Sequence, residues 1–214
     1  MDVERFAREL PALFDDFPRS PHPRDRRFAP LLEAVPGLAA ENNLALVNFA
    51  ASLLEPGETY LEVGAWKGLS LVAAALENEG DFVAVDDFSF RDGSREELLA
   101  NLVRFGVENV TVFEGDALRL LRDGVLAEGS VGVYYYDAAH GYRQQLDALR
   151  LVEPYLAERA LVVVDDSDWE EVARATREYL AGQPRARLVF EIGGSSRGQP
   201  QWWEGIQLIA WGAD

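Results

Sequence analysis

From Thr59 onward the sequence alternates between short apolar runs and longer segments of helical spacing, and this alternation restricts the fold more than any other feature. The apolar runs have the length of strands and cover 60–63, 82–85, 110–113, 131–136, 160–164, 187–192 and 205–211. Helical periodicity fills the intervals between the first six, for example at 95–105 and 142–156. Strands that alternate with helices predict right-handed βαβ units and a doubly wound α/β domain with a mostly parallel sheet.

The last two apolar runs lack a helix between them. Glycine and serine occupy this interval, at Gly193, Gly194, Ser195, Ser196 and Gly198. We therefore expect an antiparallel hairpin with a long loop at this edge of the sheet. The run 161–164 is apolar at every position, which is typical of a strand covered by helices on both faces.

The first 57 residues follow a different pattern. Apolar residues recur at helical spacing between Val3 and Phe17, and a second helix is expected over 39–54, before Pro56-Gly57. This region predicts a helical cap that packs on the main domain.

Five of the ten prolines lie between Pro18 and Pro36, together with four arginines. Proline prevents a long regular element, so we expect a loop here. The predicted division is a cap or lid segment at 1–57 and a ligand-binding domain at 58–214. The sequence leaves open whether the proline-rich loop is a lid or a subunit contact, and whether the protein is a homodimer.

Composition excludes several classes of protein. Acidic residues number 37 against 20 basic ones, and a net charge of −17 opposes binding to nucleic acid or to an anionic membrane surface. No apolar run approaches the roughly 20 residues that span a bilayer, and the first ten residues lack the apolar segment of an export signal. The chain has no cysteine, which excludes disulfides and thiolate metal sites, and we expect a cytoplasmic location.

The first expected strand runs directly into a glycine-containing turn, with the sequence Leu61-Glu62-Val63-Gly64-Ala65-Trp66-Lys67-Gly68-Leu69-Ser70. Gly64 and Gly68 would let the backbone approach a ligand, and the helix that follows offers free N–H groups. An ordinary tight turn would favour glycine too. The spacing E-x-G-x-x-x-G differs from the G-x-G-x-x-G fingerprint, which argues against NAD or FAD.

Acidic residues follow the second and third expected strands. Asp86 and Asp87 come about 20 residues after the glycine turn, where a carboxylate can accept hydrogen bonds from ribose hydroxyls. A solvated loop acid is the alternative. Asp116-Ala117 could begin a helix as its N-cap or meet an adenine amino group. Ligands of open α/β sheets bind at the carboxyl ends of the strands, so these positions predict one common site.

Three further carboxylates, Asp137, Asp165 and Asp166, follow the fourth and fifth expected strands. Carboxylates on neighbouring strand ends repel one another unless a cation or protons lie between them. Oxygen ligands suit Mg²⁺, or alternatively Ca²⁺ or Mn²⁺. His140 follows Asp137 by three residues and titrates near neutrality, so it could act as a base, although it could equally cap a helix.

The succession Glu62-x-Gly64-x-x-x-Gly68, Asp86 and Asp116 resembles that of class I S-adenosylmethionine-dependent methyltransferases, over residues 59–165. The glycine turn is particularly similar to that of the metal-dependent catechol and caffeoyl-CoA O-methyltransferases. The D-x-x-H pattern followed by two aspartates is similar to that of macrocin-type sugar O-methyltransferases. The resemblance implies a seven-stranded Rossmann-like sheet of order 3-2-1-4-5-7-6, with the last strand antiparallel.

The resemblance also implies roles for individual residues. Gly64 and Ser70 would lie beside the methionine part of the cofactor, Asp86 would bind ribose, and the Asp116-Ala117 turn would face adenine. The whole expected cofactor set is Glu62, Gly64, Ala65, Gly68, Ser70, Asp86, Asp87, Asp116, Ala117 and Asp137. Asp137, Asp165 and Asp166 match the metal ligands of the resembled enzymes. The catechol enzymes carry a lysine where His140 stands, which puts catechol itself in doubt as the acceptor.

These observations predict a methyltransferase that methylates a hydroxyl of a small molecule (a natural product, sugar or phenol) with the help of a metal ion. Asp137 and His140 are the expected catalytic residues. The alternatives are a metal-independent methyltransferase with His140 as base, a nicotinamide-dependent oxidoreductase, and a non-catalytic ligand-binding protein. Three tryptophans, Trp169, Trp202 and Trp203, could wall an acceptor pocket or simply pack in the core.

Overall fold

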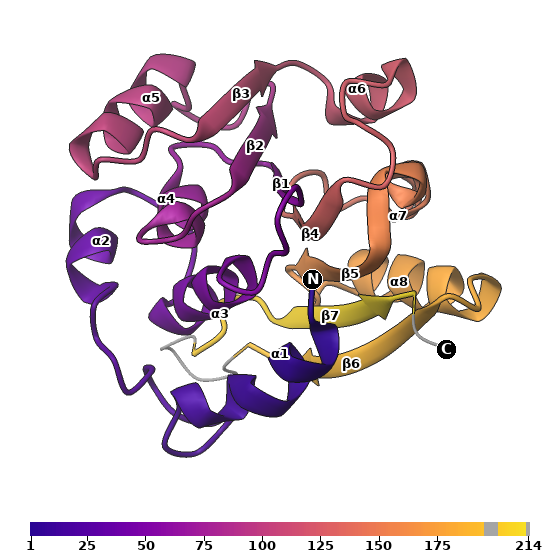
Figure 1. The fold of residues 1–214 in the computed structure, drawn as a ribbon, viewed down its shortest axis with the longest axis horizontal. Coiled ribbons are helices and arrows are strands. Elements are labelled where there is room, and N and C mark those ends of the chain that lie inside the picture. Colours follow the sequence, from indigo (N-terminus) through magenta and orange to yellow (C-terminus); the bar gives the residue numbers. More distant parts are fainter. Residues whose placement is uncertain (195–200, 213–214) are drawn as a thin grey trace.

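The alternating pattern folds into a seven-stranded sheet between two layers of helices (Figure 1). The structure is a computed structural model, and it describes residues 1–194 and 201–212. The strands are β1 (Thr59–Val63), β2 (Asp81–Asp86), β3 (Val110–Glu114), β4 (Val131–Tyr136), β5 (Leu156–Asp165), β6 (Ala186–Ile192) and β7 (Ile206–Trp211). Their order is β3-β2-β1-β4-β5-β7-β6, and β7 runs antiparallel to both of its neighbours. The predicted fold class and strand order are confirmed.

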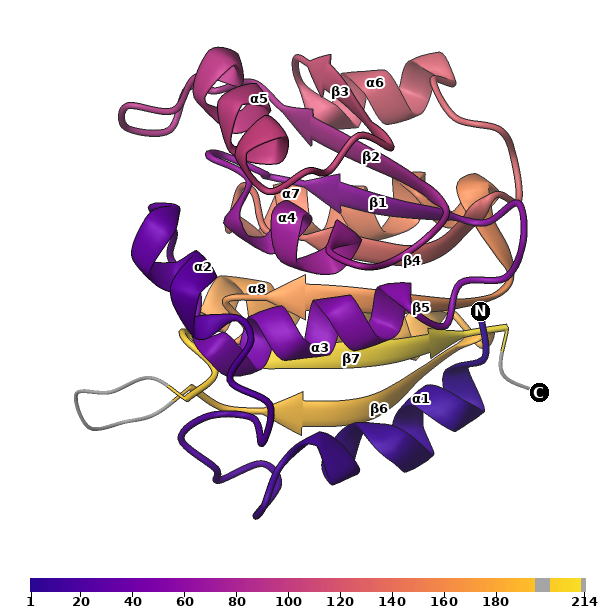
Figure 2. The same cartoon turned by 60° about the vertical axis from the view of Figure 1, so that its left-hand side comes forward.

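The helices divide between the two faces of the sheet (Figure 2). One face carries α1 (Val3–Glu9), α3 (Glu41–Ala51), α4 (Leu69–Ala75) and α5 (Arg95–Arg104). The other carries α6 (Ala117–Asp123), α7 (Tyr142–Leu151) and α8 (Glu170–Gly182). The short helix α2 (Ala29–Ala34) and two 3₁₀ turns, at Leu10–Leu13 and Glu153–Tyr155, complete the described elements. None of the described helices has both the length and the apolar character needed to cross a bilayer.

Successive strand residues enter opposite cores. Tyr60 and Phe82 point into the core under α3 and α4, whereas Leu61 and Val83 point into the core under α6, α7 and α8. Because helices cover both faces, each central strand is apolar at nearly every position. This explains the continuous apolar runs in the sequence.

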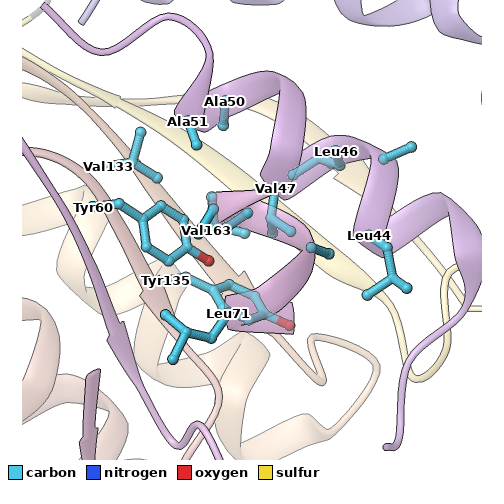
Figure 3. Close-up of a cluster of buried hydrophobic side chains, with 14 of the residues drawn as sticks. Leu44, Leu46, Val47, Ala50, Ala51, Tyr60, Leu71, Val133, Tyr135 and Val163 are labelled. Atoms are coloured by element: carbon cyan, nitrogen blue, oxygen red, sulfur yellow. The ribbon is translucent and has the colours of Figure 1, made fainter. Parts of the chain in front are cut away.

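Residues 1–57 supply a large part of one core. Leu44, Val47 and Ala51 of α3 pack toward the sheet, near Tyr60 and other strand residues (Figure 3). Helix α1 lies beside α3 on the same face of the sheet (Figure 2), and there the Phe6 and Phe49 rings stack with centroids 5.7 Å apart. Each fully buried leucine or valine stabilises the fold by roughly 1.5–3 kcal/mol.

The N-terminal prediction was wrong in one respect. The stretch between Pro18 and Pro36 was expected to be a loop, but it contains the helix α2. Pro30 lies in the first turn of α2, where the missing N–H has no helical partner to lose. Proline therefore starts this helix rather than preventing it.

Candidate active site

A cleft of about 590 Å³ opens at the carboxyl ends of the central strands. The residues predicted from the sequence that line it are Gly64, Ala65, Ser70, Asp86, Asp87, Asp116, Ala117, Asp137, His140 and Asp166. The lining also includes residues 36–39, between α2 and α3, and Trp203, which precedes β7. The predicted positions therefore converge on one site, while Glu62, Gly68 and Asp165 lie behind its surface.

The glycine turn is fixed by a close approach between β1 and β4. Gly64 has a φ of +95°, and a Cβ at this position would lie 1.8 Å from the carbonyl oxygen of Asp137. The two strand ends are tied together where the Asp137 N–H donates to the Val63 carbonyl at 2.8 Å. Gly64 is therefore required by the backbone geometry, and this geometry brings Asp137 next to the turn.

Asp86 connects the ends of β1 and β2. Its Oδ2 accepts a hydrogen bond from the Trp66 N–H, and its Oδ1 accepts one from the Phe88 N–H, both at 2.6 Å. Each carboxylate oxygen has a second lone pair, so a half-buried Asp86 can still accept from a hydroxyl in the cleft. Its neighbour Asp87 is exposed, and hydrogen bonds from Ser89 lower the pKa of the Asp87 carboxyl.

Asp116 caps helix α6 and lines the cleft as well. Its Oδ1 accepts from the Arg119 N–H at 2.9 Å, which satisfies one of the free N–H groups of the first turn. Ala117 begins the helix and also lines the cleft. Asp116 is therefore the N-cap of α6, one of the two roles that the sequence allowed, and the Asp116-Ala117 turn still borders the cleft.

Glu62 is fully buried behind the glycine turn. Its two oxygens accept hydrogen bonds from the Tyr60 hydroxyl at 2.8 Å and from the Ser70 hydroxyl at 2.7 Å. Burial raises the pKa of Glu62 to about 7, although both hydrogen bonds act in the opposite direction. Glu62 therefore holds Ser70 in place at the start of α4 and has no direct contact with the cleft surface.

Asp137, His140 and Asp166 form a cluster at the ends of β4 and β5. One possible ligand atom from each lies within 4.8 Å of the others, and His140 Nε2 is 2.9 Å from Asp166 Oδ2. Burial raises the pKa of the Asp137 carboxyl well above its usual range, and the nearby Asp165 and Asp166 raise it further. Two carboxylates and an imidazole are donors that suit a divalent cation, and the excess of buried negative charge favours one.

Asp165 is directed away from this cluster. Its Oδ2 accepts a hydrogen bond from the buried Tyr135 hydroxyl, and its Oδ1 accepts from the Asp166 N–H at 3.0 Å. Burial, followed by the charge of Asp166, raises the pKa of Asp165 to about 7. Of the three predicted metal ligands, two face each other with His140 beside them. Ligation by Asp165 stays a prediction.

The three tryptophans have different environments. Trp202 is buried against Phe14, with ring centroids 5.3 Å apart, and its Nε1 donates to the Pro18 carbonyl, so it is a packing residue. Trp203 lines the cleft with a left-handed backbone, at a φ of +48°. Trp169 is 48% exposed, and its ring centroid lies 5.0 Å from that of His140.

Two parts of the site were not predicted from the sequence. Residues 36–39 line the cleft, and their only signal was the Pro36-Gly37 pair, which marks a turn. Lys67, the only lysine of the chain, also lines the cleft and pairs with Asp92 at 2.8 Å and Glu97 at 3.1 Å. These ion pairs attach the loop after β2 and the first turn of α5 to the glycine turn. They join residues that are distant in the sequence, so no local pattern predicts them.

Known proteins share this fold and part of this sequence. A family model described as "Methyltransferase domain" matches residues 61–167, half of the chain. Over 149 residues the chain is 28% identical to a tRNA (guanine-N(7)-)-methyltransferase of Bordetella pertussis, an overlap of 66% of this chain and 58% of that protein. The chain thus spans less than two thirds of the length of the curated relatives that it matches.

Solved structures resemble the whole fold at low sequence identity. A Corynebacterium glutamicum protein superposes with a TM-score of 0.69 at 13% identity, over 100% of this chain and 99% of that one. The O-methyltransferase TomG from Streptomyces achromogenes, solved in complex with SAM, gives a TM-score of 0.63 at 19% identity over 100% of both chains. At such identities the likeness shows the fold.

Proposed function

Because the chain belongs to the methyltransferase domain family, we propose that it is an S-adenosylmethionine-dependent methyltransferase, and that it methylates a hydroxyl group of a small molecule with the help of a divalent cation. The observation that carries this proposal is the cluster of Asp137, His140 and Asp166, which lines the cleft at the ends of β4 and β5. It combines cation ligands with a possible base at the place where ligands of this fold bind.

The half of the cleft at the ends of β1, β2 and β3 would hold the cofactor. S-adenosylmethionine supplies an electrophilic methyl group on its sulfonium. Asp86 would accept hydrogen bonds from ribose hydroxyls, and the Asp116-Ala117 turn would contact adenine. The complete proposed set is Gly64, Ala65, Gly68, Ser70, Asp86, Asp87, Asp116, Ala117 and Asp137, with Glu62 acting through Ser70.

The half at the ends of β4 and β5 would hold the acceptor. The His140 Nε2–H would donate to Asp166, which would orient the imidazole and stabilise its protonated form, and the other ring nitrogen, Nδ1, would accept the hydroxyl proton. Asp137 and Asp166, with Asp165 as the third predicted ligand, would hold a cation such as Mg²⁺, which lowers the pKa of a bound hydroxyl. Alignment of the acceptor oxygen with the methyl group then accounts for much of the rate.

A second candidate is a metal-independent methyltransferase with His140 as the base. The close contact between His140 and Asp166 supports it, because a carboxylate beside an imidazole can orient a base without any cation.

Two measurements test the proposal. Calorimetry with S-adenosylhomocysteine should show saturable binding, and its failure would remove the cofactor assignment. Methyl transfer to a panel of hydroxylated acceptors should then be lost after treatment with EDTA and return with added Mg²⁺. Activity that survives complete removal of metal would favour the metal-independent enzyme, and cofactor binding without turnover of any acceptor would favour a ligand-binding protein.

A further inference from the structure

Negatively charged side chains far outnumber positively charged ones in the lining of the cleft. Among the described lining residues, the carboxylates are Asp86, Asp87, Asp116, Asp137 and Asp166. The same lining offers one lysine or arginine, Lys67. Its side chain is only 7% exposed and is already neutralised by Asp92 and Glu97. Lys67 is therefore a poor partner for an anionic ligand.

Bound cofactor and cation would not reverse this imbalance. A sulfonium cofactor brings one net positive charge and a divalent cation brings two, against five lining carboxylates. An acceptor that carries a carboxylate or phosphate would enter a cleft that still repels it, inside a protein whose net charge is −17.

The acceptor half also presents aromatic and apolar surface. Trp203 lines this half, and its left-handed backbone is a costly conformation for a bulky residue, of the kind that collects at binding sites. Trp169 is a large, exposed aromatic side chain next to His140. Leu38 and Ala39, from the N-terminal segment, add apolar surface to the lining of the cleft. Tryptophan faces bind flat rings and cations, and have no preference for anions.

We propose that the acceptor is a neutral or cationic hydroxylated compound with a flat face, and that the cleft selects against carboxylates, phosphate esters, coenzyme A thioesters and nucleic acid. This inference rests on the proposed function, because it assumes a methyl acceptor beside His140. It separates the chain from its Bordetella pertussis relative, whose name specifies a tRNA substrate.

The test uses the full chain saturated with S-adenosylhomocysteine and Mg²⁺. Ligand-observed NMR measures binding of probes in matched triplets, in which one hydroxylated ring carries a carboxylate, a methyl or an aminomethyl group. Phenol, catechol, hydroxyindole and hydroxyquinoline rings are each used in this way. We expect the neutral or cationic member to bind at least tenfold more tightly than the anionic member in every triplet that binds.

Substitution of a residue that lines the cleft tests the charge selection without depending on the ring of the probe. Ala39→Lys adds a cation to the lining, and Ala39→Gln adds a neutral side chain of similar length. In the lysine variant, the ratio of the affinity for the neutral probe to that for the anionic probe should fall several-fold. In the glutamine variant this ratio should stay as in the wild type.

The outcomes that contradict the charge selection differ from those that contradict the proposed function. Tighter binding of anionic members, no binding by any triplet, or equal effects of the two Ala39 variants would overturn the charge selection alone. Failure of S-adenosylhomocysteine to bind would instead overturn the proposed function, and the acceptor class with it.

Discussion

His140 Nε2 lies 2.9 Å from Asp166 Oδ2, and the backbone of Asp166 is in the left-handed region with a φ of +53°. Such a backbone costs of order 1 kcal/mol for a residue with a Cβ, and persists where its surroundings fix it. Here the Asp166 N–H donates a hydrogen bond to the Asp165 carboxylate, which also accepts one from the Tyr135 hydroxyl. Two buried residues behind the site, Tyr135 and Asp165, thus hold Asp166 in the conformation that contacts His140.

Replacing His140 by glutamine should reduce methyl transfer by roughly 10²–10⁴-fold, because glutamine cannot accept a proton at neutral pH. Binding of S-adenosylhomocysteine should stay unchanged, since His140 lies in the acceptor half of the cleft. Calorimetry and a radiometric transfer assay measure the two quantities. His22, the other histidine of the chain, provides the matched control, and His22→Gln should retain activity. Full activity of His140→Gln would contradict the role as base.

Gly64→Ala should destabilise the fold by at least about 3 kcal/mol, since it combines an unfavourable φ with a collision between Cβ and the Asp137 carbonyl. Gly57 has a similar φ of +87° but no atom within 4 Å of its hypothetical Cβ. Gly57→Ala should therefore cost only about 1 kcal/mol, the price of the left-handed conformation. Urea unfolding measures both, and equal losses would show that the approach to Asp137 is not what demands glycine.

Local patterns in the sequence predicted the sheet well, because central strands are apolar throughout and the glycine turn and strand-end acids have fixed spacing. They failed at α2, where Pro30 was taken as a breaker although it begins the helix. They also did not separate Trp202 from Trp203. These are adjacent residues, and the packing of Phe14 and Phe17 against Trp202 depends on contacts across more than 180 positions.

The candidate site was predicted as a set of positions, but not as a set of orientations. Asp165 and Asp166 are adjacent and chemically identical, yet Asp165 faces Tyr135 and Asp166 faces His140. The difference arises from the left-handed backbone at Asp166. Aspartate adopts this conformation more readily than most residues, but two adjacent aspartates give no sign of which one adopts it. Similarly, Glu62 belongs to the motif, while its full burial between Tyr60 and Ser70 is a tertiary property.

Glu62 should make the stability of the protein depend on pH. Burial raises its pKa from 4.5 to about 7 in the folded chain. Below pH 4.5 the carboxyl is protonated in both states, so it has no effect on the free energy of unfolding. Between pH 4.5 and 7 the unfolded chain releases a proton that the folded chain keeps, so stability falls as pH rises. The loss is of the order of 3 kcal/mol.

Urea unfolding of the wild type and of Glu62→Gln at pH 5 and pH 8 isolates this contribution. The variant should lose less stability than the wild type between these two pH values. Glu128→Gln, at an exposed position, serves as the control and should follow the wild type. Parallel profiles for the wild type and Glu62→Gln would show that the buried carboxyl does not hold its proton to near neutrality.

Binding of Mn²⁺ should distinguish the two adjacent aspartates. Asp166→Asn removes a carboxylate that faces Asp137 and His140, so Mn²⁺ binding should weaken at least tenfold, as metal sites do when a ligand or its support is lost. Asp165→Asn should weaken it less, because this carboxylate is engaged by Tyr135 and by the Asp166 N–H. Electron paramagnetic resonance of free Mn²⁺ measures both variants, and S-adenosylhomocysteine binding confirms that each remains folded. Equal losses would mean that Asp165 leaves Tyr135 to join the ion, and that the three-carboxylate set expected from the sequence is the correct one.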